Sequence, residues 1–184
     1  RPWRTERFTQ VKIASFWKLP QVILSEEHAR LREWLAGRPE FTDHVVFRTS
    51  GSSGVEKWVA LSKEALEWSA RRVIATLGMT AGDVCGLALP MVHVGGFGLM
   101  LRAYLSGAAL VEFEGKWNAE RFGDWCAGEG VTMTSLVPTQ VSDLVEGGIV
   151  APACLRSVVV GGGVLKADLA ERAKSLGWPV LPSY

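Results

Sequence analysis

The sequence predicts an α/β fold in which helices cover both faces of a mostly parallel sheet. Short apolar runs alternate with longer segments whose apolar residues recur at helical spacing. The apolar runs are continuous, as is typical of strands that are buried on both faces. No repeat, low-complexity tract or shift in composition divides the 184 residues, so we expect a single domain. Ligands of such folds bind at the carboxyl ends of the strands.

The first elements begin and end at recognisable capping residues. Ser25 can cap a helix that stops at Gly37, and residues 43–48 follow as a short strand. A loop rich in glycine and serine comes next. Ser62 then caps a second helix, whose apolar stripe ends at Gly78.

The rest of the chain repeats this order of strand and helix. The expected strands are residues 84–89, 108–112, 132–137 and 155–160, and a last one that begins at 180–181. The expected helices run from the Gly95-Gly96 pair to about residue 105, from Asn118 to 126, over a short stretch from Pro138, and over 166–176. Right-handed crossovers between parallel strands place such helices on both faces of the sheet.

Composition narrows the range of partners. The 20 basic and 19 acidic side chains give a net charge of +1 without a basic cluster, which argues against nucleic acid. No run is long and apolar enough to cross a bilayer, and residues 1–4 lack the apolar core of a signal peptide. Cys85, Cys126 and Cys154 are isolated and odd in number, which indicates a reducing cytoplasm and no metal site. A homodimer is one assembly that the sequence leaves open.

The segment Thr49-Ser50-Gly51-Ser52-Ser53-Gly54-Val55-Glu56-Lys57 is the most informative stretch for chemistry. Its glycines let successive backbone N–H groups converge, its hydroxyls add donors, and Lys57 supplies a compact positive charge. This combination suits a triphosphate, although a flexible surface loop has the same composition. It is not the common P-loop, because no Gly-Lys-Ser/Thr closes it and the next helix starts only after Ser62.

The segment resembles the phosphate-binding signature of the adenylate-forming superfamily, Thr/Ser-Ser/Thr-Gly-Ser/Thr-Thr/Ser-Gly-x-Pro-Lys. This superfamily includes acyl-CoA synthetases, luciferases and peptide-synthetase adenylation domains. Glu56 stands where proline is usual. The resemblance implies that ATP and Mg²⁺ are cofactors and that Lys57 is catalytic. It also implies a set of phosphate-binding residues, namely Thr49, Ser50, Gly51, Ser52, Ser53, Gly54 and Lys57.

Two further stretches agree with the superfamily in order and spacing. Residues 89–97 are similar to the segment in which a histidine or aromatic residue lines the acyl pocket near the reacting carboxylate. This makes His93 a catalytic and substrate-binding candidate and Phe97 a substrate-binding one. Taken alone, His93 would be interpreted as a hydrogen-bonded structural histidine. Residues 158–163 resemble the strand and glycine turn against adenine, with Gly161, Gly162 and Gly163 as contacts; the alternative is an ordinary strand-to-helix turn.

The last residues look like the start of the Tyr-Gly-x-Thr-Glu signature, so Tyr184 would pack on adenine and the magnesium-binding glutamate would follow it. The similarity extends from about Val45 to Tyr184. Members usually carry a longer N-terminal segment and a small mobile C-terminal domain with a catalytic lysine. We therefore expect residues 1–184 to be one partial N-terminal AMP-binding domain without the mobile domain.

Within the superfamily, residues 135–140 and 93–102 resemble the o-succinylbenzoate:CoA ligases of menaquinone biosynthesis. Their substrate carries a second carboxylate, which a buried cation would satisfy. Arg102 is the candidate cation, although it could equally be a solvated residue on a helix face. Val137 and Thr139 would shape the acyl side of the pocket.

The resemblance implies ATP-dependent activation of a small-molecule carboxylic acid, o-succinylbenzoate in particular, through an acyl-adenylate to a coenzyme A thioester. One alternative is another aryl- or acyl-CoA ligase. A second is a non-catalytic domain that at most binds nucleotide.

Overall fold

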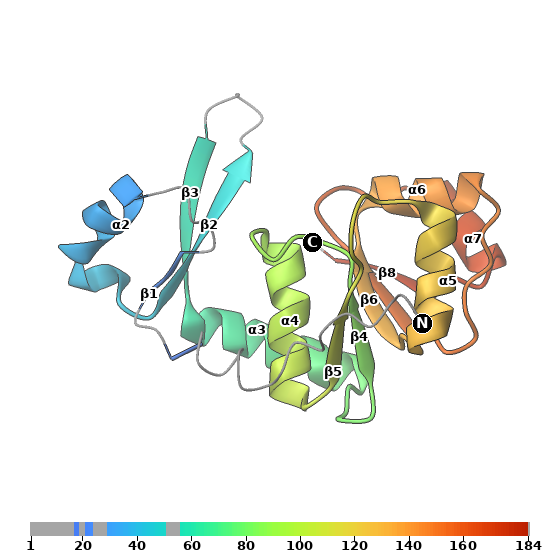
Figure 1. Cartoon of the computed structure of the whole chain (residues 1–184), viewed down its shortest axis with the longest axis horizontal. Helices are drawn as coiled ribbons and strands as arrows, with labels where there is room; N and C mark the ends of the chain where they lie inside the picture. The colour runs from blue at the N-terminus through green and yellow to red at the C-terminus, as the bar shows by residue number, and fades with distance from the viewer. Residues whose placement is uncertain (1–16, 19–20, 24–28, 51–55, 184) are drawn as a thin grey trace.

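The computed structural model describes residues 17–18, 21–23, 29–50 and 56–183. Their strands form two sheets (Figure 1). The smaller sheet has the order β1-β2-β3, with β1 Gln21–Ile23, β2 His44–Ser50 and β3 Glu56–Ser62. The larger sheet has the order β5-β4-β6-β7-β8, with β4 Val84–Leu87, β5 Ala109–Glu112, β6 Met133–Leu136, β7 Ser157–Val160 and β8 Val180–Pro182. All neighbours in the larger sheet are parallel, which confirms the predicted fold class.

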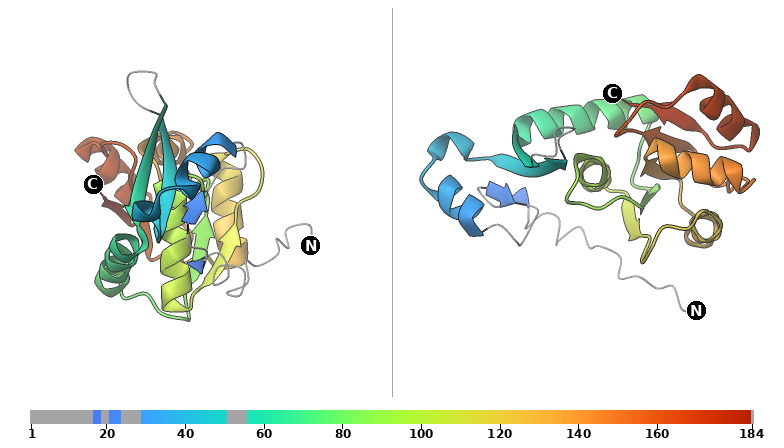
Figure 2. Two further views of the ribbon diagram at one scale, coloured as in Figure 1. Left: turned by 90° about the vertical axis from the view of Figure 1, so that its left-hand side faces the viewer. Right: turned by 90° about the horizontal axis from the view of Figure 1, so that it is seen from above.

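Helices cover both faces of the larger sheet, as predicted (Figures 1 and 2). One face carries α3 Lys63–Leu77 and α4 Val94–Ser106, and the other carries α5 Ala119–Glu129, α6 Pro138–Glu146 and α7 Ala167–Ser175. The short helices α2 Ala29–Ala36 and η1 Pro39–Phe41 precede β2. None of the helices in the described part of the chain is long and apolar enough to span a bilayer.

The predicted capping residues position the main helices. Ser62 Oγ accepts a hydrogen bond from the backbone N–H of Ala65 at 3.2 Å and starts α3. Asn118 Oδ1 accepts from the N–H of Arg121 at 2.8 Å and starts α5. Gly78 ends α3 with a φ of 60°, which costs glycine little. Ser25, the predicted cap of the first helix, lies outside the described residues.

Strand β3 is an element that the sequence analysis did not predict. Residues 56–62 were expected to belong to a loop, but they pair antiparallel with β2, with His44 opposite Ser62 and Ser50 opposite Glu56. Between 57 and 60 exposed and half-buried residues alternate, because one side of this sheet faces solvent. The glycine-rich segment therefore connects two antiparallel strands of a separate sheet.

The two sheets share one hydrophobic core. Val45 and Phe47 of β2 are buried together with Phe97 of α4. The rings of Phe47 and Phe97 meet edge to face with centroids 5.3 Å apart, a geometry that adds to the energy of burial. In Figure 1 the end of β2 and the start of β3 point to the same side of the molecule as the carboxyl ends of the larger sheet.

At the amino ends of these strands, Asp83 links three segments. Its side chain is 4% exposed and accepts hydrogen bonds from Arg156 Nη2 at 2.7 Å, Thr132 Oγ1 at 2.8 Å and the Thr80 N–H at 2.8 Å. Burial alone would raise the pKa of this carboxyl. The hydrogen bonds from Arg156, Thr80 and Thr132 and the charge of Arg156 outweigh burial, so the pKa lies below its usual value.

We expect Asp83→Asn to lower the free energy of unfolding by about 2 kcal/mol at neutral pH, because charge-assisted hydrogen bonds are lost. A depressed folded-state pKa stabilises the fold above the unfolded-state pKa, and that stability is lost as the pH falls through the folded-state value. The difference between wild type and variant should therefore shrink below about pH 4. Urea unfolding at several pH values measures this difference in the free energy of unfolding, with Asp124→Asn at an exposed position as control. Equal stability of wild type and variant at neutral pH would contradict the assignment.

Candidate functional site

Predicted residues from three segments lie at the carboxyl edge of the larger sheet. Strand β6 lies between β4 and β7 in the order of strands. His93 follows β4 and starts α4, Val137 follows β6 and starts α6, and Gly161 follows β7. Since these strands are parallel, the segments after them emerge at the same edge, where ligands of such sheets bind.

The glycine turn lies against the start of α6. A Cβ added to Gly162, which has a φ of 74°, would lie 3.3 Å from Val137 Cγ1. A Cβ on Gly163 would lie 3.5 Å from Pro138 Cγ. Thr139 is exposed in the first turn of the same helix. The fold therefore brings the glycine turn against Val137 and Pro138, while the contacts of the turn, Val137 and Thr139 with adenine or an acyl group stay predictions.

His93 and Phe97 face different surroundings. The His93 side chain is exposed and makes no capping hydrogen bond, although its carbonyl accepts from the Phe97 N–H at 3.0 Å. Phe97 is 0% exposed and packs against Phe47 and Trp17. Phe97 thus fixes helix α4 to the smaller sheet, and its contact with an acyl group stays a prediction.

Arg102 is buried two turns into α4. Its residue exposure is 9%, which rules out the alternative of a solvated arginine on a helix face. Its Nη2 donates to Ser135 Oγ at 2.9 Å, whereas its Nε has no hydrogen-bond partner. Among the described residues, no carboxylate lies within ion-pairing distance of Arg102. Burial lowers the pKa of the guanidinium, but arginine keeps its charge in proteins.

Cys85 does not neutralise this charge. If the Cys85 thiol lost its proton, the negative charge of the thiolate would interact with the Arg102 guanidinium. Burial raises the pKa of Cys85 to about 12, although the nearby guanidinium acts in the opposite direction. The thiol is therefore neutral at physiological pH. A buried cation with an unused N–H donor and no counter-charge in the described part of the chain is suited to an anionic ligand.

The predicted phosphate segment is described only at its two ends. Lys57 is exposed in β3, opposite Thr49 of β2, and Ser50 lies opposite Glu56 in the backbone register. Gly51, Ser52, Ser53 and Gly54 lie outside the described residues, and so does Tyr184. Their contacts with nucleotide stay predictions.

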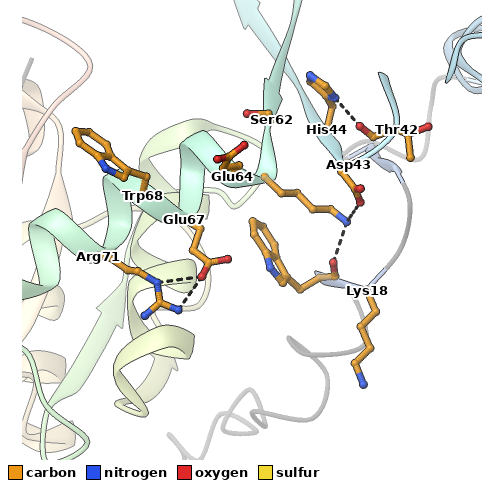
Figure 3. A pocket seen from close by; sticks show the side chains of 11 residues that line it. Lys18, Thr42, Asp43, His44, Ser62, Glu64, Glu67, Trp68 and Arg71 are labelled. Atoms are coloured by element: carbon orange, nitrogen blue, oxygen red, sulfur yellow. Dashed lines mark hydrogen bonds and ion pairs between the residues drawn. The ribbon is translucent and has the colours of Figure 1, made fainter. Parts of the chain in front are cut away.

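A cavity of about 800 Å³ lies at the other end of the β2–β3 ladder, next to the start of α3 (Figure 3). In it, Lys63 Nζ donates to the Trp17 carbonyl at 2.9 Å and pairs with Asp43 at 3.4 Å. None of the predicted site residues lines this cavity. The His44–Ser62 pair beside it is six residues along the ladder from the Ser50–Glu56 pair, or about 20 Å. The cavity is therefore separate from the candidate site.

Ser135 is a site residue that the sequence analysis did not single out. The sequence distinguishes it only as the first residue of the stretch 135–140, but its hydroxyl is the described partner of Arg102. The sequence places Ser135 in a short strand that is expected to be buried. Because a buried hydroxyl needs a hydrogen-bond partner, this position could have indicated that Ser135 binds another polar side chain.

Comparisons with known proteins identify the family of this chain. The model of the family described as AMP-binding enzyme matches residues 31–184, and so begins earlier than the similarity expected from Val45. The 2-succinylbenzoate–CoA ligase of Bacillus cereus (strain AH820) is 30% identical over 161 residues, which are 86% of this chain and 33% of that protein. The chain thus spans about a third of the length of this curated relative.

Solved structures show the same fold. O-succinylbenzoate coenzyme A synthetase (MenE) from Bacillus subtilis in complex with AMP superposes with a TM-score of 0.66 at 28% identity, covering 76% of this chain and 36% of that one. The same enzyme in complex with ATP and magnesium ion superposes with a TM-score of 0.66 at 27% identity. The match covers 74% of this chain and 28% of that one. Because the family model matches most of its residues, the chain belongs to the AMP-binding enzyme family.

Proposed function

We propose that the protein containing this chain uses ATP to activate 2-succinylbenzoate, through an acyl-adenylate, to its coenzyme A thioester. The observation that carries this proposal is Arg102, a buried cation without a counter-ion among the described residues, next to the carboxyl edge of the sheet. A substrate with a second carboxylate would supply the missing charge. The similarity to 2-succinylbenzoate–CoA ligases supports the same substrate.

The chemistry has two balanced steps. A carboxylate oxygen of the acid attacks the α-phosphorus of ATP, the bond to the β-phosphate oxygen breaks, and pyrophosphate leaves. The thiol of coenzyme A then attacks the acyl carbon, loses its proton, and displaces AMP. The protein contributes mainly positioning and charge neutralisation to such transfers.

Each side of the reaction has its own residues in this proposal. Residues 49–57 would clamp the β- and γ-phosphates, with Lys57 as the positive charge, while Gly161–Gly163 and Tyr184 would hold adenine. His93, Phe97, Val137 and Thr139 would shape the acyl pocket. Arg102 would bind the carboxylate that does not react.

We expect magnesium to be bound together with ATP. A Bacillus subtilis relative is solved with ATP and magnesium ion, and we expect the same pair to be bound here. However, no three His, Cys, Asp or Glu side chains in the described ranges gather to hold a metal.

The proposal also covers the localisation, the domain organisation and the assembly of the protein. We expect a cytoplasmic enzyme whose larger N-terminal domain contains this chain and whose mobile C-terminal domain lies elsewhere in the protein. The cysteines Cys85, Cys126 and Cys154 are all free, which fits a reducing compartment. A homodimer is the assembly to test first.

Turnover with different acids tests the function. Full-length protein is mixed with ATP, Mg²⁺ and a panel of acids, pyrophosphate release is measured, and the thioester is identified by mass spectrometry. We expect kcat/KM to be highest for 2-succinylbenzoate. A higher value for a fatty acid or a simple aromatic acid would indicate a different acyl-CoA ligase. Absence of both turnover and calorimetric binding of ATP would indicate a non-catalytic domain.

A further inference from the structure

Helix α4 carries two glycines on the same face as Arg102. Gly95, Gly98 and Arg102 are spaced i, i+3 and i+7, so they lie on one face of this 13-residue helix. A Cβ added to Gly98 would lie 3.2 Å from Arg102 Nη1, which is closer than such contacts normally are. The guanidinium therefore extends back along α4 toward its first turn, at the carboxyl edge of the sheet, over the space that glycine leaves.

Strand β6 holds the other side of the guanidinium. Ser135 is 5% exposed, and its Oγ accepts the 2.9 Å hydrogen bond from Arg102 Nη2. Because β6 is a buried central strand, this oxygen is rigidly placed. An arginine has five N–H donors in a fixed plane, so one bond to a fixed acceptor restricts where the others point.

We infer that Ser135 and Gly98 are positioning residues for the selection of dicarboxylic acids. Ser135 orients the Arg102 guanidinium, and Gly98 leaves the space that Nη1 occupies, so that the remaining N–H groups can meet a carboxylate. This inference rests on the proposed function, since it concerns the carboxylate that does not react. Neither residue needs to touch the substrate, because both act through Arg102.

Kinetics with matched acids test the inference in the full-length enzyme. The acids are 2-succinylbenzoate and the two monoacids in which hydrogen replaces either carboxylate; the monoacid that still reacts serves as reference. We expect Ser135→Ala to raise KM for the diacid about tenfold, which corresponds to one charge-assisted hydrogen bond, and to change kcat less than about twofold. The monoacid kinetics should not change. Ser135→Thr keeps the hydroxyl and should restore the diacid KM.

A second pair of variants keeps the test independent of the folding of Ser135→Ala. Gly98→Ala should also raise KM for the diacid, because its methyl group displaces Nη1. Gly128→Ala in α5 is the control, because a Cβ there meets nothing within 4 Å. Unchanged preference for the diacid in both Ser135→Ala and Gly98→Ala would overturn the inference. If the wild-type enzyme itself does not prefer the diacid, the proposed substrate is wrong instead.

Discussion

Lys57→Ala is expected to slow ATP-dependent pyrophosphate release about 100- to 1000-fold in the full-length enzyme, the range seen when one donor to developing charge is removed. Lys57 is exposed in β3 and is the last residue of the segment 49–57 that we assign to the terminal phosphates. Charge accumulates on pyrophosphate as it leaves. A positioned ammonium group therefore stabilises the transition state more than the bound substrate.

Initial rates at saturating ATP and acid measure this effect. Lys174→Ala on α7 is the matched control, because Lys174 is exposed and pairs only with Glu171 among the described residues. We expect its rate to equal that of the wild type. A Lys57→Ala enzyme that retains the wild-type rate would remove the glycine-rich segment from the proposed nucleotide site.

Arg102→Met separates catalysis from stability. Methionine fills much of the same buried volume without a charge, so we expect kcat/KM for 2-succinylbenzoate to fall about 100-fold or more through loss of the carboxylate partner. The free energy of unfolding should not fall, because replacing an unneutralised buried charge by an apolar side chain is often neutral or stabilising.

Steady-state kinetics and urea unfolding of the same preparations give both quantities. Arg172→Met, an exposed position on α7, is the control and should change neither. A variant that loses stability and retains its kinetics with the diacid would mean that Arg102 serves the fold alone.

The larger sheet was predictable because local and tertiary signals agree there. Continuous apolar strands and well-placed caps such as Ser62 and Asn118 specify the same elements that packing requires. Strand β3 was missed for a physical reason. The glycine-rich stretch before it suggested that the loop continued to Ser62, and the pairing with β2 that makes it a strand emerges only with the fold.

The candidate site was predictable in outline but not in its contacts. The order of the motifs places His93, Val137 and Gly161 at one edge, and the parallel register of β4, β6 and β7 accounts for this. Whether Arg102 is solvated or buried depends on contacts across the fold that local sequence does not encode. The bond to Ser135 joins residues 33 positions apart and emerges only with the fold.

The contact between Phe47 and Phe97 has a consequence for how two reactants could meet. One ring belongs to the strand that leads into the nucleotide segment, and the other belongs to the helix that carries Arg102. Protein cores are close-packed and have low compressibility, so the distance between these two packed rings changes little. In the proposed enzyme, the distance between the triphosphate site and the acid site would thus be fixed before either substrate binds. Folding would already have ordered the two sites, so that less entropy is lost when the substrates are aligned.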